Sequence, residues 1–441
     1  MNNLPPRYLI AGGIHYFGYL GFMSKFSEVL KNRNFFCLWL GQIISQLGDR
    51  LGQMALIGFV SSARPGSSTV EIAKMLFFTI APVFVIGPLA GVYVDRWDRR
   101  RTMYLSDFLR TIIFFVIPFF LYYSKSLWLV YLLIFLAFCV GRFFIPAKLS
   151  IVPELVKSKD LLIANSLINI TGMIAAIGGF GLGGLVVEWW GAKNGLYLDG
   201  LTFFISGLLI FLISHKSKSS KINLWEFSYQ VAEVIRKSVL EELREGIVYF
   251  WKNKEVRFAA WVMFVLSAAL GGSSVVLIGF IQKVFNSVTR DFGLLSMFLG
   301  LGLFFGSISY GRFGQRISRY KIIFISLVLS GSILILFVLS QMLKASFLIA
   351  ACFAFIMGVA ISPIVIVVNT AIHNFSHSAM MGKVFSSLEM VMHFGFIAFM
   401  FISGLLTRIF SYVIILNSLG IILILTGIVN LIFHRKIPWL D

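Results

Sequence analysis

Long apolar segments recur along the whole of this chain, and they constrain its fold more than any other feature. Each segment is long enough to cross the ~30 Å hydrocarbon core of a bilayer as an α-helix, which takes about 20 residues. The twelve segments lie near 35–60, 71–94, 102–123, 128–147, 163–187, 196–214, 258–281, 292–313, 322–343, 347–372, 384–407 and 411–433. Because 58% of the 441 residues are hydrophobic and only 13% are charged, the chain lacks the polar surface of a water-soluble protein. The sequence therefore predicts an all-α membrane protein with twelve transmembrane helices.

The basic residues predict the orientation of these helices. Twelve crossings place both termini on the same side of the membrane. With that side inside, 27 of the 38 Lys and Arg residues fall on the inner flanks and loops, and eight fall outside. This excess on one side follows the positive-inside rule and predicts cytoplasmic termini. The net charge of +19 then reflects topology and contact with anionic membrane lipids, and we expect no nucleic-acid partner.

Two landmarks occur twice and indicate an internal duplication. KNRNFFCLWL (31–40) resembles KNKEVRFAAW (252–261), and VDRWDRRRTMY (94–104) resembles FGQRISRYKII (313–323). The two offsets are nearly equal, so the sequence predicts two copies of a six-helix unit. Six is an even number, so both copies insert in the same orientation, related by an axis along the membrane normal.

The duplication divides the chain into five parts. We expect an N-terminal extension over 1–32 that lies as an interfacial helix on the inner face, and a first six-helix bundle over 33–214. A polar cytoplasmic loop with a short amphipathic helix follows over 215–257. The second bundle covers 258–434, and 435–441 form a C-terminal tail.

The most specific motif follows the second apolar segment, in GVYVDRWDRRR (91–101). Its Gly-x-x-x-Asp-Arg-x-x-Arg-Arg pattern resembles that of the major facilitator superfamily. The stretches 32–56, 95–101 and 143–167 narrow the resemblance to a bacterial branch with macrolide-efflux and enterobactin-export proteins and, more distantly, lysophospholipid transporters. The resemblance implies two six-helix bundles around a central cavity that opens alternately to each side. It also implies a monomer in the bacterial inner membrane.

The resemblance also assigns an inner gate. The predicted gate residues are Gly87, Gly91, Asp95, Arg96, Arg99 and Arg100. In the superfamily the motif aspartate faces the N-terminus of the eleventh helix when the cytoplasmic side is closed, a placement worth ~0.3–1 kcal/mol. Here that helix starts at Gly382. The plainer alternative is that the arginines only anchor this loop in the cytoplasm. The second copy has Gly314 in place of the acid. We therefore expect an asymmetric latch, in which only the first copy makes the specific contact with the opposite bundle.

Four further ionisable residues fall inside the predicted helices near the inner face. They are Asp107, Arg110, Arg142 and Glu389. Charges inside a membrane face protein or water, because their exposure to lipid is costly. We therefore expect a buried ion network in which Asp107 pairs with Arg142. Direct handling of protons or substrate is the alternative for these four residues.

Two more residues are candidates for coupling. Asp49 lies near the middle of the first predicted helix, which lines the central cavity in proteins of this superfamily. A carboxylate on a cavity wall could take up and release a proton as access alternates. A local role in helix packing is equally compatible with the sequence. His393 follows Glu389 by one helical turn and could relay protons, although such histidines are more often core residues.

The remaining features concern packing and the class of function. Gly179 and Gly183 have the spacing of closely packed membrane helices. The chain has no Walker-type phosphate loop, no metal-ligand spacing and no nucleophile–base set, so we expect no enzyme activity, no cofactor and no metal. The leading hypothesis is a secondary transporter that exports an amphipathic or hydrophobic small molecule, coupled to protons. Lipid transport and a non-transporting membrane scaffold are the alternatives.

Overall fold

A computed structural model of the chain describes residues 26–63, 68–94, 97–124, 127–214, 248, 253–285, 287–314, 318–375 and 381–433. Nearly all of these residues are helical. Most of the N-terminal extension, almost all of the central loop and the C-terminal tail lie outside this description, so the interfacial helix and the amphipathic helix that we expect there are not tested.

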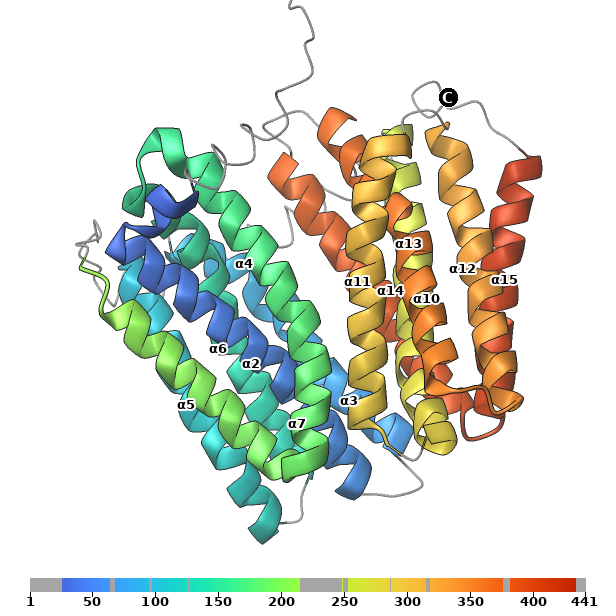
Figure 1. Cartoon of the computed structure of the whole chain (residues 1–441), viewed down its shortest axis with the longest axis horizontal. Coiled ribbons are helices and arrows are strands. Elements are labelled where there is room, and N and C mark those ends of the chain that lie inside the picture. Colours follow the sequence, from blue (N-terminus) through green and yellow to red (C-terminus); the bar gives the residue numbers. More distant parts are fainter. Residues whose placement is uncertain are drawn as a thin grey trace, which may run out of the picture.

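The first half of the chain forms one group of helices (Figure 1). It comprises α2 (Arg33–Ala63), α3 (Ser68–Ile80), α4 (Pro82–Val94), α5 (Arg99–Ser124), α6 (Leu127–Leu155), the short 3-10 helix η1 (Ser158–Asp160) and α7 (Leu161–Phe211). Within this N-terminal bundle α2 packs along α7, and α5 packs against both α6 and α7.

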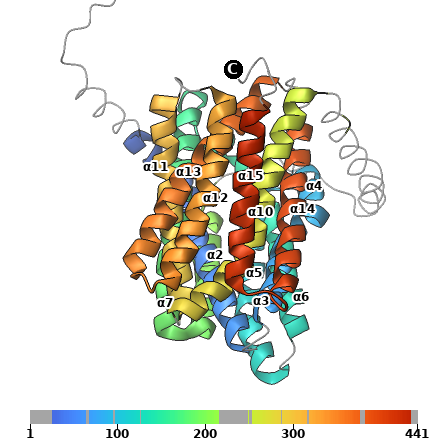
Figure 2. The same ribbon diagram turned by 90° about the vertical axis from the view of Figure 1, so that its right-hand side faces the viewer.

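The second half forms the C-terminal bundle, coloured yellow to red in Figure 1. It comprises α10 (Lys254–Phe285), α11 (Thr289–Phe313), α12 (Arg319–Met342), α13 (Phe347–Phe375), α14 (Met381–Leu406) and α15 (Tyr412–Ile432). The pairs α10–α14, α11–α13 and α12–α15 make its most extensive contacts, and α12 and α15 lie side by side in Figure 2.

Ten stretches of the described residues are long and apolar enough to cross a membrane. One of them, Ser158–Phe211, is 54 residues long and contains a break at Gly191, whose φ of 83° lies in the left-handed region. Only glycine adopts this conformation without strain, so Gly191 allows two helices to meet there within α7. α2 has 31 residues but is not among the ten stretches; it carries Asp49 and Arg50. The chain is therefore an all-helical multi-pass membrane protein.

The hydrophobic core shows where the two bundles join. One cluster of buried side chains draws on both bundles and includes Val60 and Met75 from the first and Val275 and Leu295 from the second. Each bundle also has its own separate cluster around the opposite ends of its helices. The bundles thus share a core at the end where α2 finishes and α11 begins.

Backbone contacts between α7 and α11 hold that shared end together. A Cβ atom added to Gly293 would lie 3.0 Å from Gly184 Cα and 2.5 Å from the carbonyl oxygen of Phe180, so the two helices cross at glycine–glycine distance. Near this crossing, Glu188 of α7 accepts hydrogen bonds from Ser287 at 2.8 Å and from Thr289 at 3.3 Å.

Candidate functional site

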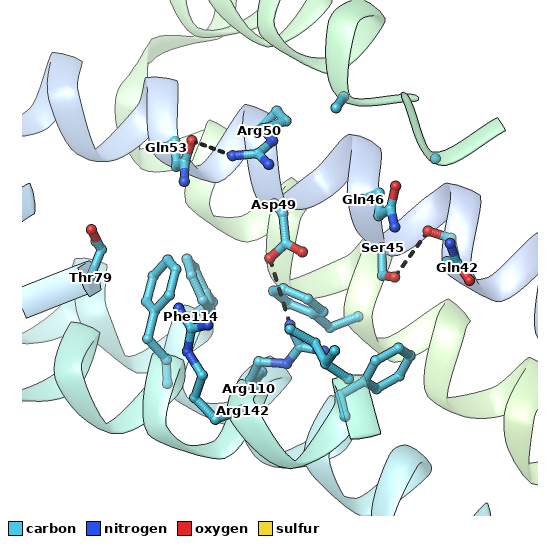
Figure 3. Close-up of a pocket in the computed structure, with 18 of the residues that line it drawn as sticks. Gln42, Ser45, Gln46, Asp49, Arg50, Gln53, Thr79, Arg110, Phe114 and Arg142 are labelled. Atoms are coloured by element: carbon cyan, nitrogen blue, oxygen red, sulfur yellow. Dashed lines mark hydrogen bonds and ion pairs between the residues drawn. The ribbon is translucent and has the colours of Figure 1, made fainter. Parts of the chain in front are cut away.

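A cavity of about 500 Å³ lies within the N-terminal bundle. Its wall is built from α2, α3, α5, α6 and α7, and Figure 3 shows the side chains of α2 facing those of α5 and α6 across it. Polar side chains project into it from successive turns of α2. These are Gln42, Ser45, Gln46, Asp49, Arg50 and Gln53. The opposite wall combines the aromatic rings of Phe114 and Phe138 with the cationic side chains of Arg110, Arg142 and Lys148. A cavity that combines polar, charged and aromatic side chains suits an amphipathic guest.

Asp49 is a wall residue of this cavity, as the sequence predicted from its position on the first helix. Its side chain is 37% exposed, and Oδ1 lies 3.6 Å from a guanidinium nitrogen of Arg110 on α5 (Figure 3). Neighbouring Arg50 makes other contacts: it donates to Gln53 at 3.0 Å and lies 5.1 Å from the ring centre of Phe180. The cavity therefore contains an ion pair between two helices with one partly accessible carboxylate.

Arg110 is the centre of the charged cluster. Its guanidinium also binds Asp107, one turn earlier on α5, whose side chain is fully buried. Ser206 of α7 donates a hydrogen bond of 2.6 Å to the other oxygen of Asp107. The guanidinium carbon lies 4.0 Å from the ring centre of Phe203, a cation–π distance. Two carboxylates and an aromatic face thus hold one arginine in a fixed position.

The predicted ion network is only partly assembled in this form. Asp107 pairs with Arg110 of its own helix, so the expected Asp107–Arg142 pair is not formed. The cause is helical spacing: residues three apart on one helix are neighbours, whereas Arg142 projects from α6 into the cavity. Arg142 is within electrostatic reach of Glu389 on α14, which belongs to the other bundle.

The contact of His393 with Glu389 differs from the one that a proton relay needs. Its Nδ1 lies 2.7 Å from the main-chain oxygen of Glu389, one turn back on α14, and not against a carboxylate. Its ring makes an edge contact with Phe84 of α4, with 6.2 Å between the ring centres. His393 therefore lies at a contact between the bundles, and the relay remains a prediction.

The gate motif is partly outside the described residues, which do not include Asp95 and Arg96. Arg99 binds Glu154 of α6, and Arg100 binds the main-chain oxygen of Phe211 at the end of α7. Both contacts stay within the N-terminal bundle. The latch across the two bundles remains a prediction for a form with a closed inner side.

The predicted packing glycines differ in their surroundings. A Cβ atom on Gly179 would lie 2.9 Å from Arg50 Cβ, and one on Gly183 would lie 2.7 Å from Leu51 Cα, so both face the backbone of α2. By contrast, a Cβ on Gly87 would find its nearest neighbour 4.0 Å away, in Val83 of its own helix α4. Gly91 also lies in α4.

The sequence analysis does not predict the involvement of two charged residues. Lys148 of α6 lines the cavity, and Asp199 of α7 is completely buried behind α2. Asp199 lies inside the apolar segment 196–214, so the test that identified Asp49, an acid inside a predicted helix, would also have found it.

Comparisons with known proteins agree on one family. The profile of the Major Facilitator Superfamily matches residues 38–299. The uncharacterized MFS-type transporter YkuC of Bacillus subtilis (strain 168) is 28% identical over 360 residues, which is 81% of each chain. The putative bacilysin exporter BacE of the same strain is 26% identical, over 80% of this chain and 83% of its own. Macrolide efflux protein A of Streptococcus pyogenes is 23% identical, over 74% and 78%.

Solved transporters share the fold. A POT family transporter in complex with a thioalcohol-conjugated peptide superposes with a TM-score of 0.70 at 13% identity, covering 92% of this chain and 97% of the other. The nucleoside transporter NupG superposes with a TM-score of 0.69 at 14% identity, covering 89% and 99%.

Proposed function

Because the chain belongs to the Major Facilitator Superfamily, we propose that it is a secondary active transporter that exports an amphipathic or hydrophobic small molecule in exchange for protons. The observation that carries this proposal is the cavity of about 500 Å³, in which the partly exposed Asp49 meets Arg110. The relatives that are named for macrolide efflux and bacilysin export support the direction of transport.

The architecture that we propose has twelve crossings in a bacterial cell membrane, with both termini in the cytoplasm. Ten stretches qualify by length and composition, the break at Gly191 divides one of them into two helices, and α2 is about 46 Å long at ~1.5 Å per residue. Polar side chains of α2 that face a cavity explain why its mean hydropathy is low for a spanning helix.

Alternating access fits an arrangement in which the two bundles share a core at one end and have separate cores at the other. In the proposed topology the shared core and the Gly184–Gly293 crossing lie at the outer side, so this form is closed to the outside. Rocking of the bundles about the cavity would separate that end and bring the motif loop to α14. Asp95 would then reach the helix end at Gly382, as the resemblance implies.

Asp49 is the residue that we assign to coupling. Its carboxylate shares Arg110 with Asp107, and it is the more exposed of the two acids. A proton on Asp49 would weaken its attraction to Arg110 and change the charge of the cavity wall. Proton binding and substrate binding at one wall can thereby exclude each other, which is what exchange requires.

Proteoliposomes test this proposal. The purified protein is reconstituted, a pH gradient is imposed, and macrolides and other amphipathic compounds are screened for proton-driven accumulation. We expect accumulation of at least one compound with the native chain and loss of its gradient dependence in Asp49→Asn. Asp160→Asn is the control, because Asp160 lies in η1 before α7, is not part of the cavity wall and makes no side-chain cap hydrogen bond. Transport that is equal with and without the gradient would remove the exchange claim.

A lipid is the second candidate substrate, and one observation favours it. Two cationic side chains of α6, Arg142 and Lys148, line the cavity, and a phosphate headgroup could contact both. The same vesicles, loaded with a fluorescent lysophospholipid, distinguish the two candidates: movement between leaflets that requires Lys148 and ignores macrolides would assign lipid transport.

A further inference from the structure

Asp199 is a buried acid that the cavity chemistry described above does not use. It lies in the second half of α7 with no exposed surface, and it packs against α2 between Gly48 and Gly52. A Cβ atom on Gly48 would lie 2.8 Å from Asp199 Oδ1, and one on Gly52 would overlap Oδ2. Two glycines one turn apart therefore leave the space that this carboxyl group fills. Asp49 follows Gly48 directly and faces the cavity.

The hydrogen bonds of Asp199 are incomplete. The hydroxyl of Thr202 donates to the main-chain oxygen of Asp199 at 2.7 Å and reaches Oδ1 only at 3.4 Å. Oδ2 is buried and has no hydrogen-bond partner. Among the residues that the structure describes, no basic side chain lies within ion-pair distance of this carboxyl group, although Arg110 is within electrostatic reach.

The nearby charges cannot neutralise a third carboxylate. The titratable groups that face Asp199 are Asp49 from α2 and Arg110 from α5. Arg110 already binds Asp107 and lies 3.6 Å from Asp49, so three acids share one arginine. An ionised carboxylate with an unpaired oxygen and no cation is among the costliest groups to bury, whereas a neutral carboxylic acid is far less costly.

We propose that Asp199 binds a proton on Oδ2 in this conformation and is a second proton site, coupled to Asp49 through Arg110. When the proton leaves Oδ2 for the water of the cavity, the new carboxylate competes with Asp49 for the single guanidinium. Loss of one proton behind α2 thereby changes the charge of the cavity wall on its other side. This inference deepens the proposed proton-coupled transport and depends on it for its functional meaning.

Infrared spectroscopy of the purified protein tests the protonation without any substrate. A neutral carboxylic acid has a C=O band that a carboxylate and an amide lack. We expect this band near neutral pH in the native chain, its loss in Asp199→Asn and its retention in Asp107→Asn. If the spectrum of Asp199→Asn keeps every carboxylic-acid band of the native chain, the proposal is overturned.

A second variant keeps the test open if Asp199→Asn does not fold. Gly52→Ala preserves the acid and places a Cβ atom 1.9 Å from Asp199 Oδ2, so the carboxyl group has to turn. We expect the same carboxylic-acid band at a shifted frequency, because the surroundings of the oxygen that binds the proton change. A band that does not move in Gly52→Ala would place the proton elsewhere and refute the assignment.

The coupling is tested by distances between spin labels. Leu162 at the start of α7 and Phe313 at the end of α11 are exposed, and they lie in different bundles at the same end of the molecule. In a cysteine-free background we expect the distance between labels at these positions to change with pH, and this change to disappear in Asp199→Asn. A pH response that survives in Asp199→Asn would refute coupling. Failure of transport in vesicles would instead count against the proposed function and leave the infrared result standing.

Discussion

The two bundles have matching sequence landmarks, yet among the described residues only the first holds a cluster of charged side chains in its interior. Counted from the first residue of each helix, Asp49 of α2 corresponds to Leu270 of α10. In the same way Asp107 and Arg110 of α5 correspond to Leu327 and Ser330 of α12. Where the N-terminal bundle has an ion cluster, the C-terminal bundle therefore has apolar packing and one small hydroxyl.

The cavities of the two bundles differ in the same way, in the charge of their walls. The cavity of the N-terminal bundle has five charged residues in its wall: Asp49, Arg50, Arg110, Arg142 and Lys148. Two smaller cavities of the C-terminal bundle, of about 100 and about 380 Å³, are lined by apolar side chains and serines, and none of their wall residues is charged. The two bundles therefore pair their helices in corresponding ways, while the charged cavity residues lie in the first bundle.

The largest expected effect comes from Arg110→Leu. Removal of this cation leaves Asp107 buried and unpaired, and breaking a buried pair in this way costs about 3–5 kcal/mol. We expect a large loss of stability, measured as the shift in thermal unfolding by size-exclusion chromatography in detergent. The matched change in the other bundle is Ser330→Ala, which removes a buried hydroxyl without a hydrogen-bond partner and should be nearly neutral. Equal losses from both changes would contradict the asymmetry.

The double variant Asp107→Leu/Arg110→Leu sharpens the comparison by giving α5 the apolar character of α12. Replacement of a whole buried ion pair by hydrophobic residues is often neutral or stabilising. We expect stability to return to within about 1–2 kcal/mol of the native value while proton-driven transport is lost. A double variant as unstable as Arg110→Leu would mean that the pair itself, rather than its broken half, sustains the fold.

A change at the junction of the bundles should have a smaller effect. Gly293→Ala places a Cβ atom 2.5 Å from the carbonyl oxygen of Phe180, and overpacking of this kind costs about 1–3 kcal/mol. We expect easier opening of this end, measured as faster labelling of a cysteine placed at Ser287. Gly311→Ala in the same helix is the control, because no atom lies within 4 Å of its added Cβ. Unchanged labelling would argue against a tight α7–α11 crossing.

The smallest effect is expected at the first residues of α5 and α12. Arg99→Gln removes the contact with Glu154, and because both side chains are about one-quarter exposed the cost should be below about 1 kcal/mol. The matched variant Arg319→Gln should change stability even less. A transport defect in Arg99→Gln without a loss of stability would favour a gating role for the motif in the first copy, and its absence would favour a topology anchor.

The sequence predicted much of the helical framework but little of the pairing. Apolar segments near 102–123 and 128–147 became α5 and α6, and the segments 163–187 and 196–214 became the two helices that meet at Gly191 within α7. The sequence points to Asp107, Arg110 and Arg142 but not to Lys148 or Asp199. It also predicts an Asp107–Arg142 pair, whereas the structure pairs Asp107 with Arg110. The positions of ionisable residues along their own helices do not say which helix faces meet.

The apolar segments are enough to establish a membrane-embedded bundle of helices, because a run of about 20 apolar residues has no other stable form in a bilayer. That Asp49, Arg110 and Asp199, from three helices, share one cluster follows from the way the helices pack. The packing is hidden in the sequence because the surroundings of a membrane helix are apolar on every side. Side chains that face lipid and side chains that face the core are equally apolar, so the sequence pattern does not reveal which side of each helix turns inward.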